Sequence, residues 1–144
     1  MTDGVSIREF RYPEDYPQAA RLWQAQTKGV RFGRSDVPEE IEKKMQRDPD
    51  LFLVAEADGQ LIATVIGAYD GRRGFVYHLA VDDAYRRRGI AEALMAELEK
   101  RLVAKGSIRV YLLVAADNHE ARAFYEKNNW TWLDYDVIYA KDIA

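Results

Sequence analysis

The chain has 144 residues, of which 48% are hydrophobic and 31% are charged, and its net charge is −3. This composition is typical of a soluble globular protein, so we expect a single domain over residues 1–144. The acidic balance disfavours nucleic-acid binding, and the lack of cysteine excludes disulfides, thiolate catalysis and cysteine-ligated zinc. We expect no metal and no membrane partner, since no apolar run approaches the roughly 18–20 residues that span a bilayer. The N-terminus shows no signal peptide, which favours a cytoplasmic protein.

The first third of the chain predicts one strand and two helices. Residues 5–10 alternate apolar and polar side chains, as a strand does. Pro17 fits the first turn of a helix that continues to about residue 25. After a glycine-containing loop, Asp36 predicts the capped start of a second helix, which runs to about residue 47.

The middle of the chain predicts three antiparallel strands in a row. They cover residues 51–57, 61–69 and 75–81, and turn sequences rich in Asp and Gly separate them. In the last of them, a period of two places Phe75, Tyr77 and Leu79 on one face. Val76, His78 and Ala80 fall on the other face.

The remainder of the chain predicts two helices and two further strands. A helix begins at Gly89 and ends at Gly106, and a buried strand over 107–115 follows. Asp117 with Glu120 forms a capping-box pattern that opens a helix to about residue 128. Residues 130–139 read as a last strand. The resulting order, β-α-α-β-β-β-α-β-α-β, indicates a mixed α/β sheet.

The strand that ends at Val81 leads into a basic loop and then directly into a helix. The loop reads Arg86-Arg87-Arg88-Gly89-Ile90-Ala91. Free backbone N–H groups and the helix dipole favour an anion at such a helix start, and phosphate is a natural ligand. The sequence lacks the Gly-Lys-Ser/Thr ending of a Walker loop and the three glycines of a dinucleotide fingerprint. Spacing alone leaves an anion site and a solvated basic loop equally open.

The surrounding residues resemble the GCN5-related N-acetyltransferases, the GNAT family. The pattern Arg86-x-x-Gly89-x-Ala91, preceded by Leu79-Ala80-Val81, is similar to the family's acetyl-CoA motif. The stretch from Asn118 through Phe124-Tyr125 to Lys127 resembles its second motif, although Asn128-Asn129-Trp130 replaces the usual Leu-Gly-Phe-like triplet. Residues 50–56 and 67–71 resemble small, stand-alone bacterial members of the YpeA type. The resemblance implies the GNAT fold, with four helices and a mostly antiparallel sheet of six or seven strands.

The family resemblance implies acetyl-CoA as the cosubstrate and a place for each part of it. The loop amides would hold the pyrophosphate, and the strand ending at Val81 would pair with the pantetheine arm. The thioester would lie in the gap between the strand ends at Val81 and Ala115. Asn118 would contact the pantetheine, or serve only as a polar residue of the first helical turn. The implied cofactor-binding residues are Leu79, Ala80, Val81, Arg86, Arg87, Arg88, Gly89, Ile90, Ala91, Asn118 and Tyr125.

Tyr125 is the leading candidate for a catalytic acid, since a phenol can protonate or hydrogen-bond a departing thiolate. The family tyrosine at this motif position has that role, whereas a core aromatic is the structural alternative. Many relatives carry a glutamate base on the strand over 75–81, and this chain has no carboxylate there. Tyr77 is the better-placed polar group by resemblance, and His78 is expected to be a partly buried partner on the opposite face. A water chain that ends at backbone carbonyls is a further alternative.

An amine acceptor, either a small molecule or a protein amine, would bind beside the loop over 28–36. Arg31, Phe32, Tyr69 and Asp70 are the predicted pocket residues, with a solvated surface loop as the alternative. The chain is expected to be a monomer or a homodimer.

The sequence therefore favours an N-acetyltransferase that works by direct attack in a ternary complex, and the lack of cysteine is consistent with that route. A GNAT-type module that binds CoA without turnover, as a sensor or a subunit, is the alternative. A nucleotide phosphate-binding protein is a third class.

Overall fold

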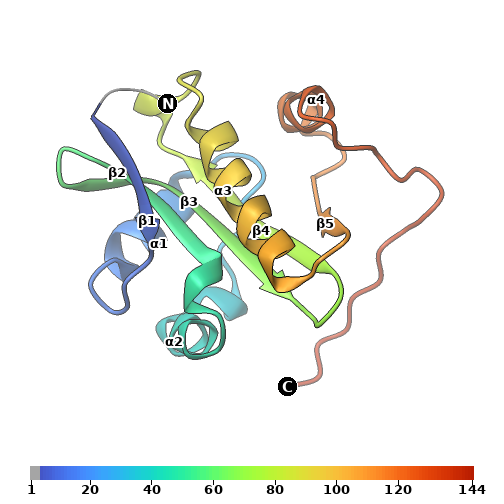
Figure 1. Ribbon diagram of the computed structural model, residues 1–144, viewed down its shortest axis with the longest axis horizontal. Coiled ribbons are helices and arrows are strands. Elements are labelled where there is room, and N and C mark those ends of the chain that lie inside the picture. The colour runs from blue at the N-terminus through green and yellow to red at the C-terminus, as the bar shows by residue number, and fades with distance from the viewer. Residues whose placement is uncertain (1–3) are drawn as a thin grey trace.

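A five-stranded sheet forms the centre of the computed structural model, which describes residues 4–144 (Figure 1). The strands lie side by side in chain order, the first four antiparallel and the last parallel to its neighbour. They are β1 (Val5–Glu9), β2 (Phe52–Ala57), β3 (Gln60–Tyr69), β4 (Gly74–Val81) and β5 (Val110–Leu112).

Helices cover both faces of this sheet (Figure 1). One face carries α1 (Tyr16–Ala25) and α2 (Pro38–Arg47), the other carries α3 (Ile90–Lys105), and α4 (His119–Lys127) lies on the β5 side. Short 3₁₀ turns stand at η1 (Arg34–Asp36), η2 (Pro49–Leu51) and η3 (Asp83–Tyr85). Within residues 4–144, no helix combines the length and apolar character that a membrane span requires.

The sheet separates two apolar cores. Helix α3 buries one stripe against the sheet, made of Ile90, Leu94, Met95, Leu98 and Leu102. The helix approaches so closely that a Cβ on Gly67 of β3 would lie 2.5 Å from Leu98 Cδ1. The second core lies under α1 and α2, where the Trp23 and Phe52 rings stack with centroids 6.1 Å apart. Both faces of the central strands are therefore buried, as their nearly continuous apolar sequences indicate.

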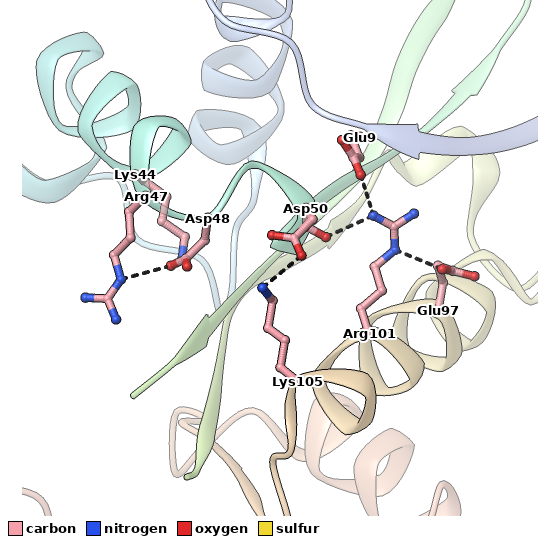
Figure 2. Close-up of polar contacts among 8 residues, drawn as sticks. All are labelled: Glu9, Lys44, Arg47, Asp48, Asp50, Glu97, Arg101 and Lys105. Carbon is pink, nitrogen blue, oxygen red and sulfur yellow. Dashed lines mark hydrogen bonds and ion pairs between the residues drawn. The ribbon is translucent and has the colours of Figure 1, made fainter. Parts of the chain in front are cut away.

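A network of ion pairs holds the C-terminal half of α3 against η2 and β1 (Figure 2). The Arg101 guanidinium contacts Glu9 Oε2 at 2.6 Å and Glu97 Oε2 at 2.9 Å, and it donates to the Asp50 carbonyl at 3.0 Å. Lys105 Nζ lies 2.9 Å from Asp50 Oδ2. These partly exposed pairs are individually weak. Together they fix the position of α3 along the sheet.

A β-bulge interrupts β4 at His78. Ile66 of β3 faces Tyr77, but Thr64 faces Ala80, so β4 has one extra residue over this stretch. His78 has φ of 51°, a left-handed conformation that few residues other than glycine adopt. The bulge corrects the predicted alternation: Tyr77, His78 and Ala80 lie on the α1 face.

Val76 and Leu79 pack against the α3 core instead. Leu79 thus lies on the face opposite Tyr77, although a strict period of two assigned them to the same one.

The fully buried Thr64 hydroxyl holds the bulge in place. It accepts a hydrogen bond from Trp23 Nε1 at 2.9 Å and donates one to the His78 carbonyl at 2.8 Å. One side chain therefore satisfies both the indole of α1 and the backbone group that the bulge takes out of the ladder.

The end of the chain is less regular than its sequence predicts. The strand expected over 107–115 is reduced to β5, and residues 130–139 form no strand, so the sheet has five strands instead of six or seven. Trp132, Ile138 and Tyr139 are exposed. An apolar sequence forms a strand only beside a partner, and the outer edge of the short β5 pairs with no described residue.

Two predicted helix caps are also wrong by one residue. Val37, not Asp36, is the N-cap of α2, and Asn118, not Asp117, caps α4 by accepting a hydrogen bond from the Ala121 N–H at 3.1 Å. The Asp36 carboxylate is instead used in a contact with β4. The left-handed cap at Gly106 is confirmed, with φ of 105°.

We predict that Thr64→Val lowers the free energy of unfolding by about 2–4 kcal/mol, because it leaves both the Trp23 indole and the His78 carbonyl buried without a partner. Thr64→Ser is the matched control, since it keeps the hydroxyl and loses one methyl, at about 1 kcal/mol. Urea denaturation measures both. Equal stability of the two variants would contradict the role of the hydroxyl.

Candidate active site

Strands β4 and β5 separate near the middle of β4. Their last pair is Val76 with Leu112, and β4 then continues alone on that side from Tyr77 to Val81. Because parallel strands exchange hydrogen bonds along their whole shared length, the separation leaves an unpaired backbone edge on β4. An extended ligand with amide groups could occupy that edge as an added strand.

The loop after β4 presents backbone amides at the end of this edge. Asp82 Oδ1 accepts from the Ala84 N–H at 2.9 Å, which turns the chain. Arg87 and Gly89 have φ of 62° and 78°, and Gly89 is the N-cap of α3 without a side-chain cap. Left-handed residues next to a helix start form a concave nest of N–H groups that favours an anion. The three arginines of the loop are exposed around it.

Arg86 also connects the loop with its neighbours. Its guanidinium lies 3.0 Å from Asp83 Oδ1 and donates to Gln26 Oε1 at 3.0 Å, and it reaches Glu120 at 4.0 Å. The end of α1, the loop and the start of α4 therefore converge at the mouth of the gap.

Asn118 and Tyr125 connect α4 with the rest of the molecule. Asn118 is buried at the helix start, and its amide lies against Gly29 of the loop between α1 and α2, 3.4 Å from where a glycine Cβ would stand. The Tyr125 ring packs edge-on against Trp130, with centroids 5.8 Å apart, beside the α3 core.

Burial raises the pKa of Tyr125 to about 12, so its phenol keeps its proton at neutral pH. The hydroxyl has no hydrogen-bond partner within residues 4–144. No fully buried side-chain oxygen or nitrogen lacks a partner there, so this hydroxyl retains some solvent-accessible surface. A neutral phenol that is not fully buried is able to donate a proton.

A histidine and a carboxylate meet on the opposite, α1 side of β4. His78 Nε2 lies 2.7 Å from Asp36 Oδ1 of η1, and the two side chains are 16% and 9% exposed. His78 is thus a partly buried partner, as predicted, but it lies on the same face as Tyr77 and not on the opposite one. The sequence did not identify its contact with Asp36, because the two residues are far apart in the chain and Asp36 matched a helix-cap pattern. No pattern in the sequence links the two residues.

The structure brings only some of the predicted acceptor residues together. Phe32 packs partly against the core under α1 and α2, and Arg31 is exposed beside it. Tyr69 packs on the other face of the sheet, where its hydroxyl lies 3.3 Å from the Cβ position of Gly106. Asp70 Oδ1 accepts from two backbone amides of the β3–β4 turn, which lowers its pKa. Tyr69 and Asp70 therefore lie away from Arg31 and Phe32.

Tyr77 precedes His78 on the α1 face, next to the dyad of His78 and Asp36. It is 47% exposed, with its ring stacked on Phe75.

Within the described residues, no group of three or more His, Cys, Asp or Glu side chains could hold a metal ion. A polar cleft of about 420 Å³ runs along α1 to the residues that follow β4, and it is lined by residues such as Gln18, Arg21, Gln60 and Asp82.

Comparisons with known proteins agree on one family. Residues 16–130 match the model of the "Acetyltransferase (GNAT) family". The chain is 39% identical over 137 residues to "Acetyltransferase SG1711" of Sodalis glossinidius, covering 95% of this chain and 94% of that protein. It is 44% identical over 133 residues to "Acetyltransferase YPTB2753" of Yersinia pseudotuberculosis, covering 92% and 89%. Among solved structures, Ard1 from Thermoplasma volcanium superposes with a TM-score of 0.78 at 26% identity, covering 89% of this chain and 83% of Ard1.

Proposed function

Because the chain belongs to the GNAT acetyltransferase family, we propose that it transfers the acetyl group of acetyl-CoA to a primary amine by direct attack in a ternary complex. The observation that carries this proposal is the separation of β4 from β5, with an amide nest at one end and Tyr125 packed against the same core as Leu79 and Val81 of β4.

The nest supports a place for the CoA pyrophosphate. The N–H groups from Arg87 to Ala91 would bind the phosphate oxygens, and the exposed arginines would add positive potential. From there the pantetheine arm would run along the backbone of Leu79, Ala80 and Val81. Asn118 would close the other side of the arm.

The chemistry needs two proton movements. The acceptor ammonium loses one proton, and the free amine then attacks the thioester carbonyl, forming the C–N bond and breaking the C–S bond. Tyr125 would give its phenolic proton to the departing sulfur, and the second proton on the attacking nitrogen would restore the phenol. Its raised pKa keeps Tyr125 in the acid form for this step. Tyr77 would line the side from which the amine enters.

We expect Tyr125→Phe to lower turnover by about 100-fold and to leave the Kd for CoA within about twofold, because the ring remains and only the proton donor is lost. Free thiol release measures turnover with four amines: a peptide with a free N-terminal alanine, an Nα-blocked lysine peptide, spermidine and kanamycin. Tyr111→Phe on β5, where the residue still pairs with Phe75 of β4, is the control. An unchanged rate would remove Tyr125 from the mechanism.

The same assay separates the alternatives. If the wild-type protein binds CoA and none of the amines releases thiol, the chain is a CoA-binding module, which the absence of a carboxylate on β4 favours. Tighter binding of ATP than of acetyl-CoA would instead indicate a nucleotide site.

Gly89→Val tests the pyrophosphate site. A β-branched residue is strained at φ of 78° and shifts the neighbouring amides, so we expect the Kd for CoA to rise at least about 10-fold. Gly59→Val in the β2–β3 turn is a close control: φ is 75°, and at both glycines a Cβ would meet nothing within 4 Å. Isothermal titration with CoA compares the two. Equal affinities would contradict the assignment.

A further inference from the structure

We propose that His78 is the base that takes the proton from the acceptor ammonium, and that Asp36 is the residue that positions it. This inference rests on the proposed acetyl transfer. It assigns the base, a role for which β4 offers no carboxylate.

The two ring nitrogens of His78 have different environments. Nε2 lies 2.7 Å from Asp36 Oδ1, so a neutral imidazole donates its N–H there and keeps a lone pair on Nδ1. Nδ1 has no hydrogen-bond partner within residues 4–144. Because no fully buried side-chain nitrogen there is unpaired, Nδ1 retains some solvent-accessible surface, in a side chain that is 16% exposed. A histidine oriented by a carboxylate at one nitrogen and open at the other is the arrangement of a general base.

The bulge determines the face of the sheet to which the His78 side chain points. In a regular strand, His78 and Tyr77 would point to opposite faces, but φ of 51° keeps His78 on the α1 face beside Tyr77. The Trp23 ring contacts the imidazole with centroids 4.9 Å apart and forms its inner wall. His78 follows the last β4–β5 pair closely, where the gap opens.

Asp36 is itself held from several sides. Its Oδ2 accepts from the Gly33 N–H at 2.9 Å, and its backbone carbonyl accepts from the Tyr16 hydroxyl at 2.6 Å. These contacts tie the carboxylate to α1 and to the loop that carries Arg31 and Phe32. The base would therefore lie on the same side as the amine that this loop would admit.

His78 and Tyr125 lie toward opposite faces of the sheet, since His78 packs against Trp23 of α1 and Tyr125 packs against the α3 core. Nδ1 would accept the ammonium proton directly or through one water and release it to bulk solvent. The amine would then attack from the α1 side while the sulfur leaves toward Tyr125. The two proton transfers thus use separate groups.

The test compares His78→Asn with His119→Asn. Asparagine tolerates left-handed backbone, so the bulge is kept, and His119 is the chain's other histidine, exposed at the start of α4. We expect H78N to lower kcat/KM at least about 100-fold for an accepted amine of the panel and to remove the acidic limb of its pH profile. CoA affinity should be unchanged, and H119N should match the wild type. The other titratable groups that bear on the dyad are Asp36, Tyr16 and Tyr77.

A second variant separates positioning from structure. In Asp36→Asn the side-chain oxygen can still accept from Gly33, but the amide donates to Nε2, which moves the neutral imidazole proton to Nδ1. We expect nitrogen NMR of labelled histidine to show an Nε2–H tautomer in the wild type and an Nδ1–H tautomer in D36N, with turnover as low as in H78N. Only two histidines contribute to the spectrum.

An Nδ1–H tautomer in the wild type, or an H78N variant that keeps the wild-type rate and pH profile, would overturn the dyad while leaving acetyl transfer intact. A wild-type protein that releases no thiol with any of the four amines would instead overturn the transfer itself.

Discussion

The Thr64 hydroxyl donates to the carbonyl of His78, and this hydrogen bond fixes the one residue at which β4 departs from a regular strand. A bulge adds local twist and bends the strand that carries it. Here it follows directly on the last pair between β4 and β5, so the twist and the separation of the strands coincide. The same bond is buried beneath Trp23, which ties the bend to α1. The shape of the gap therefore depends on a polar contact in the core.

The bulge also divides the chemistry between the two faces of the sheet. Without the extra residue, Leu79 would share a face with Tyr77, and His78 would point toward α3. With it, the imidazole lies on the α1 face beside the loop of Asp36, and the apolar side chains Leu79 and Val81 join the core beside Tyr125. A carboxylate beside His78 suits a proton acceptor, because it orients the imidazole. Apolar surroundings suit Tyr125 as a proton donor, because they keep its phenol neutral.

Much of this arrangement could be predicted from the sequence, because local patterns specify it. The Asp-Gly turn, the apolar stripe of α3 and the glycines at its two ends predicted the hairpins and that helix, and the family motif located the loop and Tyr125. The bulge could not be predicted, since no turn residue marks His78 and its cause is a hydroxyl on a neighbouring strand. Asp36 matched a cap because capping patterns do not reveal tertiary partners. Residues 130–139 have a strand's composition, but pairing depends on an edge, and the short β5 supplies none.

A crystal structure of the protein with bound CoA would show directly where the cosubstrate lies. We expect the pyrophosphate on the amides around Gly89, the pantetheine along the backbone of Leu79–Val81 and the sulfur within hydrogen-bonding distance of the Tyr125 hydroxyl, with the His78 side open to the amine. CoA bound in the polar cleft beside Gln18 and Arg21, with the gap between β4 and β5 empty, would contradict it.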